Sequence, residues 1–159
     1  MAEGTGLADA LTREHREIDE GIEAFLASLD GSDAPDAAPL QRAMRALRRH
    51  IYLEERILFP PLREAGMTMP IFVMLKEHGR LWRAMDALDD ALGKGTDAAV
   101  LRERCQSMLG ELAGHNSKEE PIVYPHADAD LADFQREQLA QFLADGTFPD
   151  GWVCERAAS

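Results

Sequence analysis

The sequence predicts an all-α fold, an antiparallel up-down-up-down four-helix bundle with a short extra C-terminal helix. The composition favours helix over sheet, because the chain is 45% hydrophobic but only 6% aromatic and is rich in Ala, Leu, Glu and Arg. Apolar residues recur at steps of three and four in four segments, which is the period of an amphipathic helix. Short connections between these segments favour antiparallel neighbours.

The first two predicted helices lie in the N-terminal part of the chain. Apolar residues at helical spacing run from Leu7 to Leu29, and the polar segment 30–35 ends this helix. The second helix runs from Leu40 to Ile57. We expect the Pro-Pro pair at 60–61 to stop it, because proline lacks a backbone donor and clashes with the preceding turn.

The third and fourth predicted helices repeat this pattern. The third follows Pro70, a good first-turn residue, and covers 71–92 until a Gly-Lys-Gly sequence ends it. The fourth covers 101–122 ahead of Pro125, and Pro121 is expected to kink its last turn.

The end of the chain carries a weaker helical pattern. A shorter helix is expected over 131–143, and residues 146–159 form a tail without predicted regular structure. At 159 residues the chain fits one well-filled core. We therefore expect a bundle domain over 1–127, with the C-terminal helix and tail of 128–159 packed on it or trailing from it.

The charge and the cysteine content exclude several classes of protein. A net charge of −12 repels phosphate backbones, so nucleic acid is not an expected partner. No basic leader segment and no long uncharged apolar run is found, which predicts a soluble, cytoplasmic protein without a membrane partner. Two cysteines form neither a disulfide framework nor a Cys-x2-Cys metal pair, in keeping with a reducing compartment.

One eleven-residue motif occurs twice, at 50–60 and at 115–125. Both copies read His-x3-Glu-Glu-x-Ile-x-aromatic-Pro. Residues four apart lie on one face of a helix, about 6 Å from each other, so each copy directs an imidazole and a carboxylate toward one point. A Glu-His pair upstream of each copy, Glu14-His15 and Glu77-His78, extends the duplication. A helical hairpin with metal-ligand spacing therefore occurs twice.

The four histidines of these motifs all lie on the apolar stripes of their helices. His15 and His78 lie early in the first and third helices, whereas His50 and His115 lie late in the second and fourth. In helices of alternating direction all four meet at one end, together with the first glutamate of each motif copy. Buried carboxylates are costly without a partner, and a dinuclear cation site neutralises two of them. The candidate metal ligands are His15, His50, Glu54, His78, His115 and Glu119.

This pattern resembles the hemerythrin-like family, also called the HHE cation-binding domain, over about residues 7–127. The family pattern is His…His-x3-Glu…His…His-x3-Glu on a four-helix bundle. The resemblance implies a non-haem centre of two iron ions with an oxo or hydroxo bridge. It also implies the ligand assignment: one iron on His15 and His50, the other on His78 and His115, and Glu54 and Glu119 as bridges.

The sequence departs from the oxygen-carrying hemerythrins, which place two histidines four residues apart on the third helix. The residues four before and four after His78 are Met74 and Trp82. Two six-coordinate irons with this ligand set keep about two coordination positions open, about one more than in the carriers. Open positions favour inner-sphere reaction with O2, peroxide or NO over reversible O2 carriage.

The leading functional interpretation is a di-iron protein that binds, senses or reacts with a small oxidant such as O2, peroxide or NO. The alternatives are a peroxide-disproportionating, catalase-like enzyme and a protein for iron storage or iron-centre repair, so enzymatic activity is left open. Ferritin-like proteins are the nearest structural competitor, but their Glu-x-x-His motif is absent. A structural zinc site generally has four tetrahedral ligands, whereas six ligands with two carboxylates suit a dinuclear octahedral centre.

Other residues near the motifs receive separate interpretations. Tyr124 occupies the motif position of Phe59, so we interpret it as a core aromatic residue instead of a metal ligand. Tyr52 lies two residues from a histidine and a glutamate of its motif and should point away from the ligand stripe. Cys105 is expected to be buried on an apolar stripe, and Cys154 in the tail is expected to be accessible.

Four further glutamates flank the candidate ligands. Glu14 and Glu77 precede histidines, where they either accept a hydrogen bond from an imidazole or are surface charges. Glu55 and Glu120 lie one helical step off the ligand stripe. Solvated positions or contacts to a ligand are expected there, not metal ligation.

Overall fold

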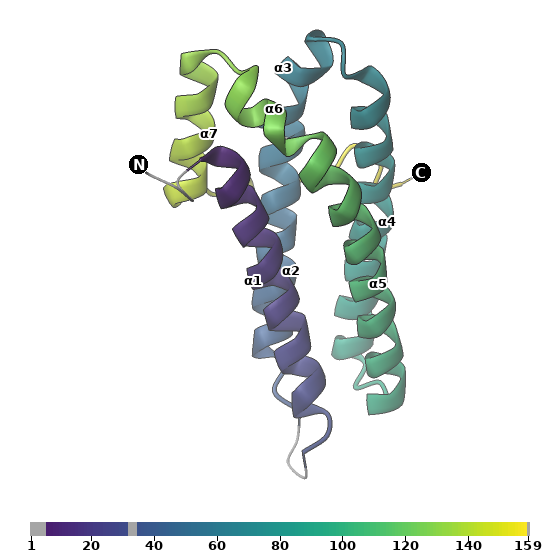
Figure 1. Cartoon of the computed structure of the whole chain (residues 1–159). Coiled ribbons are helices and arrows are strands. Elements are labelled where there is room, and N and C mark those ends of the chain that lie inside the picture. The colour runs from purple at the N-terminus through teal and green to yellow at the C-terminus, as the bar shows by residue number, and fades with distance from the viewer. Residues whose placement is uncertain (1–5, 32–34, 159) are drawn as a thin grey trace.

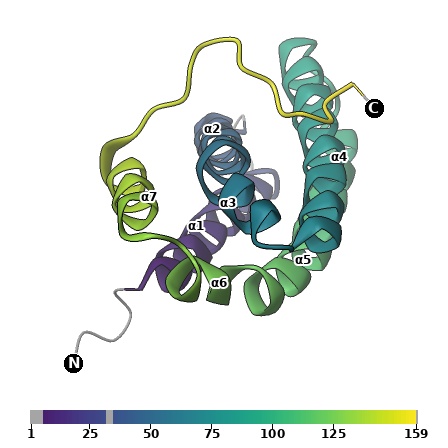
Figure 2. The same ribbon diagram turned by 90° about the horizontal axis from the view of Figure 1, so that it is seen from above.

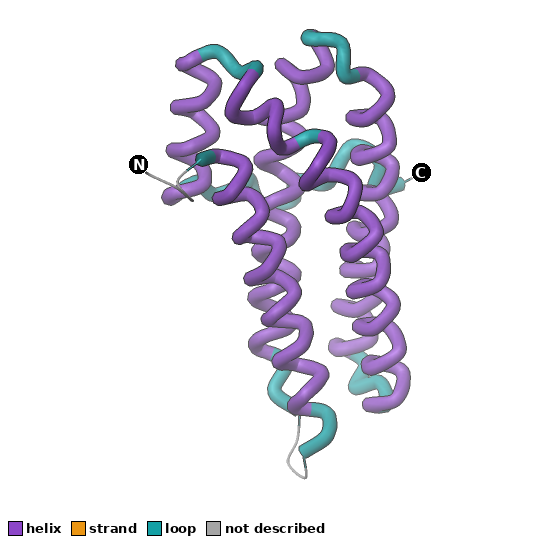
Figure 3. The backbone as a smooth tube through the Cα atoms, viewed as in Figure 1, coloured by secondary structure: helices purple, strands orange, loops and turns teal. Residues whose placement is uncertain are grey.

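The computed structural model describes residues 6–31 and 35–158. Residues 32–34, part of the polar segment 30–35 that is expected to end the first helix, lie outside the described residues, as do residues 1–5 and 159. Within the described ranges the protein is helical and has no strand (Figure 3), which confirms the predicted all-α class. The elements, in chain order, are α1 Leu7–Ser28, α2 Ala38–Leu53, a π-helix η1 Glu54–Leu58, α3 Phe59–Glu64, α4 Thr68–Gly93, α5 Ala98–Ile122, α6 Tyr124–Ala129 and α7 Asp133–Asp145.

Two helix pairs, α1 with α2 and α4 with α5, form the body of the structure (Figures 1 and 2). Contacts between α1 and α5 join the pairs. The α1–α2 connection and the α4–α5 turn lie at one end in Figure 1, and α3, α6 and α7 lie at the other. The motif residues at the C-terminal ends of α2 and α5 therefore lie toward the end that carries the short helices.

The interior consists of two apolar clusters separated by a layer of polar side chains. One cluster contains Phe25 and the other contains Phe59. On α1, His15 lies between Leu11 of the second cluster and Ile18 of the first. Each of the other three motif histidines also lies, along its chain segment, between a residue of one cluster and a residue of the other. The flanking residues are Leu47 and Leu53 for His50, Leu75 and Leu81 for His78, and Leu112 and Val123 for His115. Each fully buried leucine contributes roughly 1.5–3 kcal/mol, so the burial of these clusters stabilises the fold on both sides of the polar layer.

The helical path continues through the Pro-Pro pair at 60–61, so the prediction that these prolines stop the second helix is wrong. A five-residue π-helix, Glu54–Leu58, follows α2, and α3 begins at once with Phe59. The backbone N–H of Phe59 donates to the carbonyl of Glu54. The prolines then take the first positions of α3, where a missing N–H costs no intrahelical hydrogen bond.

Other helix boundaries also differ from the sequence-based prediction. Helix α4 begins two residues before Pro70, and Pro121 lies in the last turn of α5 as expected. The chain re-enters a helix in α6 immediately after α5, with Pro125 in its first turn. The last helix covers 133–145 in place of the predicted 131–143. Among the helices of the described ranges, none combines the length and hydropathy that crossing a membrane requires.

The C-terminal tail packs on the body of the structure and runs from α7 past α2 to α4 (Figure 2). Trp152 makes edge contacts with Trp82 and Tyr52, at centroid distances of 5.4 and 4.9 Å. These contacts anchor the tail and leave Cys154 only 2% exposed. The prediction of an accessible Cys154 is therefore wrong, whereas Cys105 is buried as predicted. Burial raises the pKa of the two thiols to about 12 and about 11 respectively.

Candidate metal centre

The structure brings all six predicted ligand side chains together between the two apolar clusters. Each of them is buried, with at most 4% of its surface exposed. They come from five elements and from both copies of the motif. The contributors are His15 on α1, His50 on α2, Glu54 at the start of η1, His78 on α4, and His115 and Glu119 on α5.

These side chains form two groups that share the two glutamates. In each group the ligand atoms lie within 4.8 Å of one another, a spacing that can hold a metal ion. The first group has His15 and His50 with both carboxylates, and the second has His78 and His115 with both carboxylates. We refer to these as the first and second ligand groups.

Each shared glutamate lies between two imidazoles that belong to different groups. The Oε2 atom of Glu54 is 3.0 Å from His50 Nε2, and its Oε1 atom is 3.0 Å from His78 Nε2. The Oε1 atom of Glu119 is 3.1 Å from His15 Nε2 and 3.3 Å from His115 Nε2. All four Nε2 atoms therefore face the same small volume.

The charges of this buried cluster suit a cation. Although burial opposes ionisation, His115 holds the pKa of Glu119 well below its ordinary value, and His50 and His78 lower that of Glu54. Burial also opposes charging of His115, but Glu119 outweighs it and raises that pKa to about 10. Among the described residues the buried Oε2 atom of Glu119 has no hydrogen-bond partner. A buried carboxylate oxygen without a donor fits metal coordination.

A second layer of carboxylates orients the imidazoles. Each Nδ1 atom lies 2.7 or 2.8 Å from a glutamate of a neighbouring element, and each of those glutamates precedes or follows another candidate ligand in the sequence. Such a contact places the proton on Nδ1 and leaves Nε2 free for a metal. The pairs are His15 with Glu120, His50 with Glu14, His78 with Glu55, and His115 with Glu77.

Sequence spacing left the roles of these four glutamates open, and the structure settles their contacts. Glu14 and Glu77 contact imidazoles on the adjacent helix, not the histidine that follows each of them in the sequence. Glu55 also accepts a hydrogen bond from the backbone N–H of Glu155, so the C-terminal tail holds it in place. The cross-helix pairing was not visible in the sequence because it depends on how the helices are rotated against one another.

The π-helix gives the first motif copy a backbone that differs from that of the second. Glu54 and Glu55 both lie in η1, where backbone hydrogen bonds join residues five apart in place of four as in an α-helix. Glu54 faces the ligand groups and Glu55 reaches His78. In the second copy Glu119 lies in α5, and the backbone N–H of Val123 donates to its carbonyl. An inserted π turn is a common way of aiming side chains at a functional site.

Tyr124 is the residue that the sequence interpretation placed differently. Its ring is buried, as a core aromatic residue would be, but its hydroxyl lies inside the first ligand group. The oxygen is 2.8 Å from both His15 Nε2 and His50 Nε2, and it donates to Glu54 Oε2 at 2.6 Å. It also lies 2.9 Å from Glu119 Oε1. The hydroxyl that distinguishes tyrosine from phenylalanine was the available signal. Tyr52, by contrast, packs against Phe142, Phe148 and Trp152, away from the centre as predicted.

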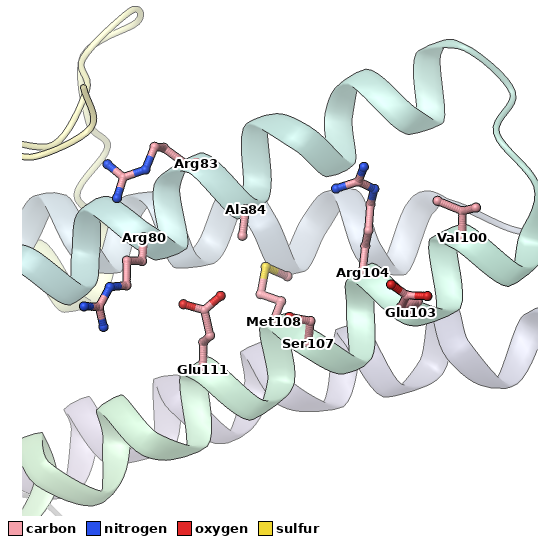
Figure 4. A pocket seen from close by; sticks show the side chains of 9 residues that line it. All are labelled: Arg80, Arg83, Ala84, Val100, Glu103, Arg104, Ser107, Met108 and Glu111. Carbon is pink, nitrogen blue, oxygen red and sulfur yellow. The ribbon is translucent and has the colours of Figure 1, made fainter. Parts of the chain in front are cut away.

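Two surface hollows lie between α4 and α5. A groove of about 610 Å³ has Arg80, Arg83 and Arg104 along its walls and contains none of the six candidate ligands (Figure 4). A smaller pocket of about 170 Å³ shares Arg80 with that groove and has His115 and Gly114 in its wall. This pocket thus borders one residue of the second ligand group, His115.

A comparison with protein families agrees with this geometry. The family model described as the Hemerythrin HHE cation binding domain matches residues 6–127. No curated protein and no solved structure matches the chain. The family match covers α1 to α5 and includes both copies of the motif. The chain belongs to the hemerythrin HHE cation-binding domain family.

Proposed function

We propose that this chain is a non-haem di-iron protein that reacts with a small oxidant, namely O2, peroxide or NO. The observation that carries the proposal is the position of Glu54 and Glu119, each between imidazoles of the two ligand groups. We further propose that residues 1–127 form an antiparallel up-down-up-down bundle around the centre. In this proposal the C-terminal segment that begins at residue 128 covers part of the bundle.

In the proposed centre each ligand group holds one iron ion. His15 and His50 are terminal ligands of one ion, and His78 and His115 are terminal ligands of the other. Glu54 and Glu119 would hold both ions, because each lies between imidazoles of the two groups. Two carboxylates are well suited to this role because they neutralise charge that the surrounding apolar clusters cannot solvate.

Iron fits this donor set better than zinc does. A mixture of imidazole and carboxylate donors with open positions is typical of non-haem iron sites, whereas structural zinc sites are closed and four-coordinate. When bound, iron supplies the electrons for reaction with the oxidant and the coordination positions at which a small molecule is held.

The residues of the chain supply orientation and exclude bulk water. The four outer glutamates fix the imidazole rings with Nε2 toward the metal positions. Met74 and Trp82, four residues before and after His78, are both buried in the apolar clusters. They provide no further imidazole, so coordination positions are left open to a small molecule. We therefore expect oxidation to a stable diferric state, and poor reversible carriage of O2.

The decisive experiment begins with protein purified from iron-replete cells. We expect two irons per chain, and we expect the diferrous form mixed with O2 to convert to a stable diferric form. Repeated recovery of O2 under vacuum over many cycles would overturn the proposed reactivity. Peroxide kinetics then separate the functional classes, because sustained turnover well above that of free iron indicates an enzyme. A single stoichiometric oxidation indicates a sensor or binding protein.

A further inference from the structure

The two ligand groups are related by the sequence duplication, and their contacts correspond one to one. The Nδ1 contact of His15 with Glu120 has its counterpart in that of His78 with Glu55. The contact of His50 with Glu14 corresponds in the same way to that of His115 with Glu77. The Nδ1 contacts are therefore of the same kind in both groups, and other residues around the groups distinguish them.

The first difference is a hydroxyl. Tyr124 and Phe59 occupy the same motif position, and each ring stacks on a histidine of the opposite copy. The ring of Tyr124 lies 5.3 Å from His15 at an angle of 30°, and that of Phe59 lies 5.5 Å from His78 at 16°. Only the first ligand group therefore receives a phenolic oxygen.

The phenolic oxygen lies where a ligand is needed. It is within 2.9 Å of one atom from each of the four side chains of the first group. A phenolate oxygen is a hard, anionic donor of the kind that ferric iron prefers. On coordination the O–H bond of Tyr124 breaks, an oxygen–iron bond forms, and the proton leaves to solvent. No oxidant or reductant is required for this step.

The second difference is the covering of the two groups. Arg49 precedes His50, and its guanidinium donates to Glu14. It also donates to the carbonyls of Phe142, in the last turn of α7, and of Gly146, which follows α7. The corresponding residue before His115 is Gly114, which has no side chain. A Cβ atom there would meet nothing within 4 Å, and the pocket of about 170 Å³ occupies this position.

We propose that Tyr124 is a seventh protein ligand, bound to the iron of the first group, and that small molecules react at the iron of the second group after entering past Gly114. This inference rests on the proposed di-iron function. It makes the two irons chemically different, although their histidine and glutamate ligands are the same in kind and number. With Tyr124 bound, one open coordination position is left, at the iron of the second group. The expected stability of the diferric state then comes from the anionic phenolate, which favours ferric iron.

The first test uses the visible spectrum of the diferric protein. Wild-type protein with two irons per chain should show a phenolate-to-iron(III) charge-transfer band with tyrosinate vibrations in resonance Raman spectra. Tyr124→Phe should lose the band and keep both irons. Tyr52→Phe is the matched control and should keep the band, since the chain has only two tyrosines and Tyr52 points away from the centre.

The outcomes of this test are separable from those of the proposed function. If wild-type protein does not bind two irons, the di-iron proposal itself fails. If it binds two irons without a phenolate band, or if Tyr124→Phe keeps the band, the ligand role of Tyr124 is overturned while the di-iron proposal stands.

The second test measures access to the iron of the second group. Gly114→Leu should fill the pocket and slow azide binding to the diferric protein on the order of tenfold, which is the effect of about 1.4 kcal/mol on a barrier. Gly110→Leu, one turn earlier on α5 and also free of neighbours within 4 Å, is the control and should leave the rate unchanged. Equal rates in the two variants would overturn the entry path.

A third variant tests the asymmetry without filling the pocket. Phe59→Tyr should add a phenolic oxygen to the second group, intensify the charge-transfer band and weaken azide binding. If Phe59→Tyr binds azide as tightly as wild type does, the reaction does not occur at the iron of the second group. This variant adds one oxygen atom at a position where a similar ring is already packed.

Discussion

The half of the centre built on His15 and His50 differs from the half built on His78 and His115 in its surroundings. The first half contains the hydroxyl of Tyr124 and is covered by Arg49. The second half has a phenyl ring at the corresponding position and a surface pocket beside it. The duplicated motif thus repeats the candidate ligands, and the two halves differ in the residues that surround them; the proposed difference in coordination and access rests on these residues.

The largest effect is expected where the two halves depend on the same residue. Glu54→Ala or Glu119→Ala should abolish loading with two irons, because each carboxylate contacts both ligand groups. Iron analysis after desalting measures this directly. Glu111→Ala, on the same helix as Glu119 and exposed, is the control and should bind as much iron as wild type. Two tightly bound irons in either bridge variant would sink the bridging assignment.

A smaller effect is expected for the carboxylates that orient the imidazoles, and it should differ between the halves. Glu14→Ala and Glu77→Ala should each weaken iron binding by about 10- to 100-fold. Glu14→Ala should cost more, because it also leaves the half-buried Arg49 without its carboxylate partner. Glu77 instead pairs with the more exposed Lys118. Competition with a chelator gives both affinities, and a larger loss in Glu77→Ala would contradict this ranking.

A third effect, on the stability of the metal-free protein, is a dependence on pH. The pKa of His115 is raised to about 10, above about 6.5 for an unfolded histidine. Its stabilising contribution is therefore complete below about pH 6.5 and is lost as the pH rises through the folded pKa. The free energy of unfolding should fall by up to about 1.4 kcal/mol per pH unit for this group.

Urea unfolding of chelator-treated protein between pH 6.5 and 10 measures this slope, and His115→Gln should reduce it. The lowered pKa values of Glu54 and Glu119 act in the opposite range, because their contribution is lost as the pH falls below about 4.5. Iron should reverse the trend on the alkaline side, since it binds neutral imidazoles and releases their protons. If the free energy of unfolding of the metal-free protein rises with pH over this range, the assignment of charged histidines is contradicted.

The all-α class, the family and the grouping of six His and Glu side chains could be predicted from the sequence. Residues three and four apart share a helix face regardless of what packs against it, so His50 and its motif glutamate had to point the same way. The burial of these polar residues followed from their position on apolar stripes. Their identity as ligands of two irons is an inference that the metal analysis tests.

Only the tertiary structure decided which side chains from different helices meet. Three features depend on residues that are far apart in the sequence. They are the contact of His50 with Glu14, the position of the Tyr124 hydroxyl inside the first group, and the burial of Cys154. The π-helix at Glu54–Leu58 also escaped prediction, because the Pro-Pro pair at 60–61 that follows it reads locally as a helix stop. Helical periodicity fixes the direction of a side chain relative to its own axis, whereas the rotation and separation of packed helices depend on how all their side chains fit together.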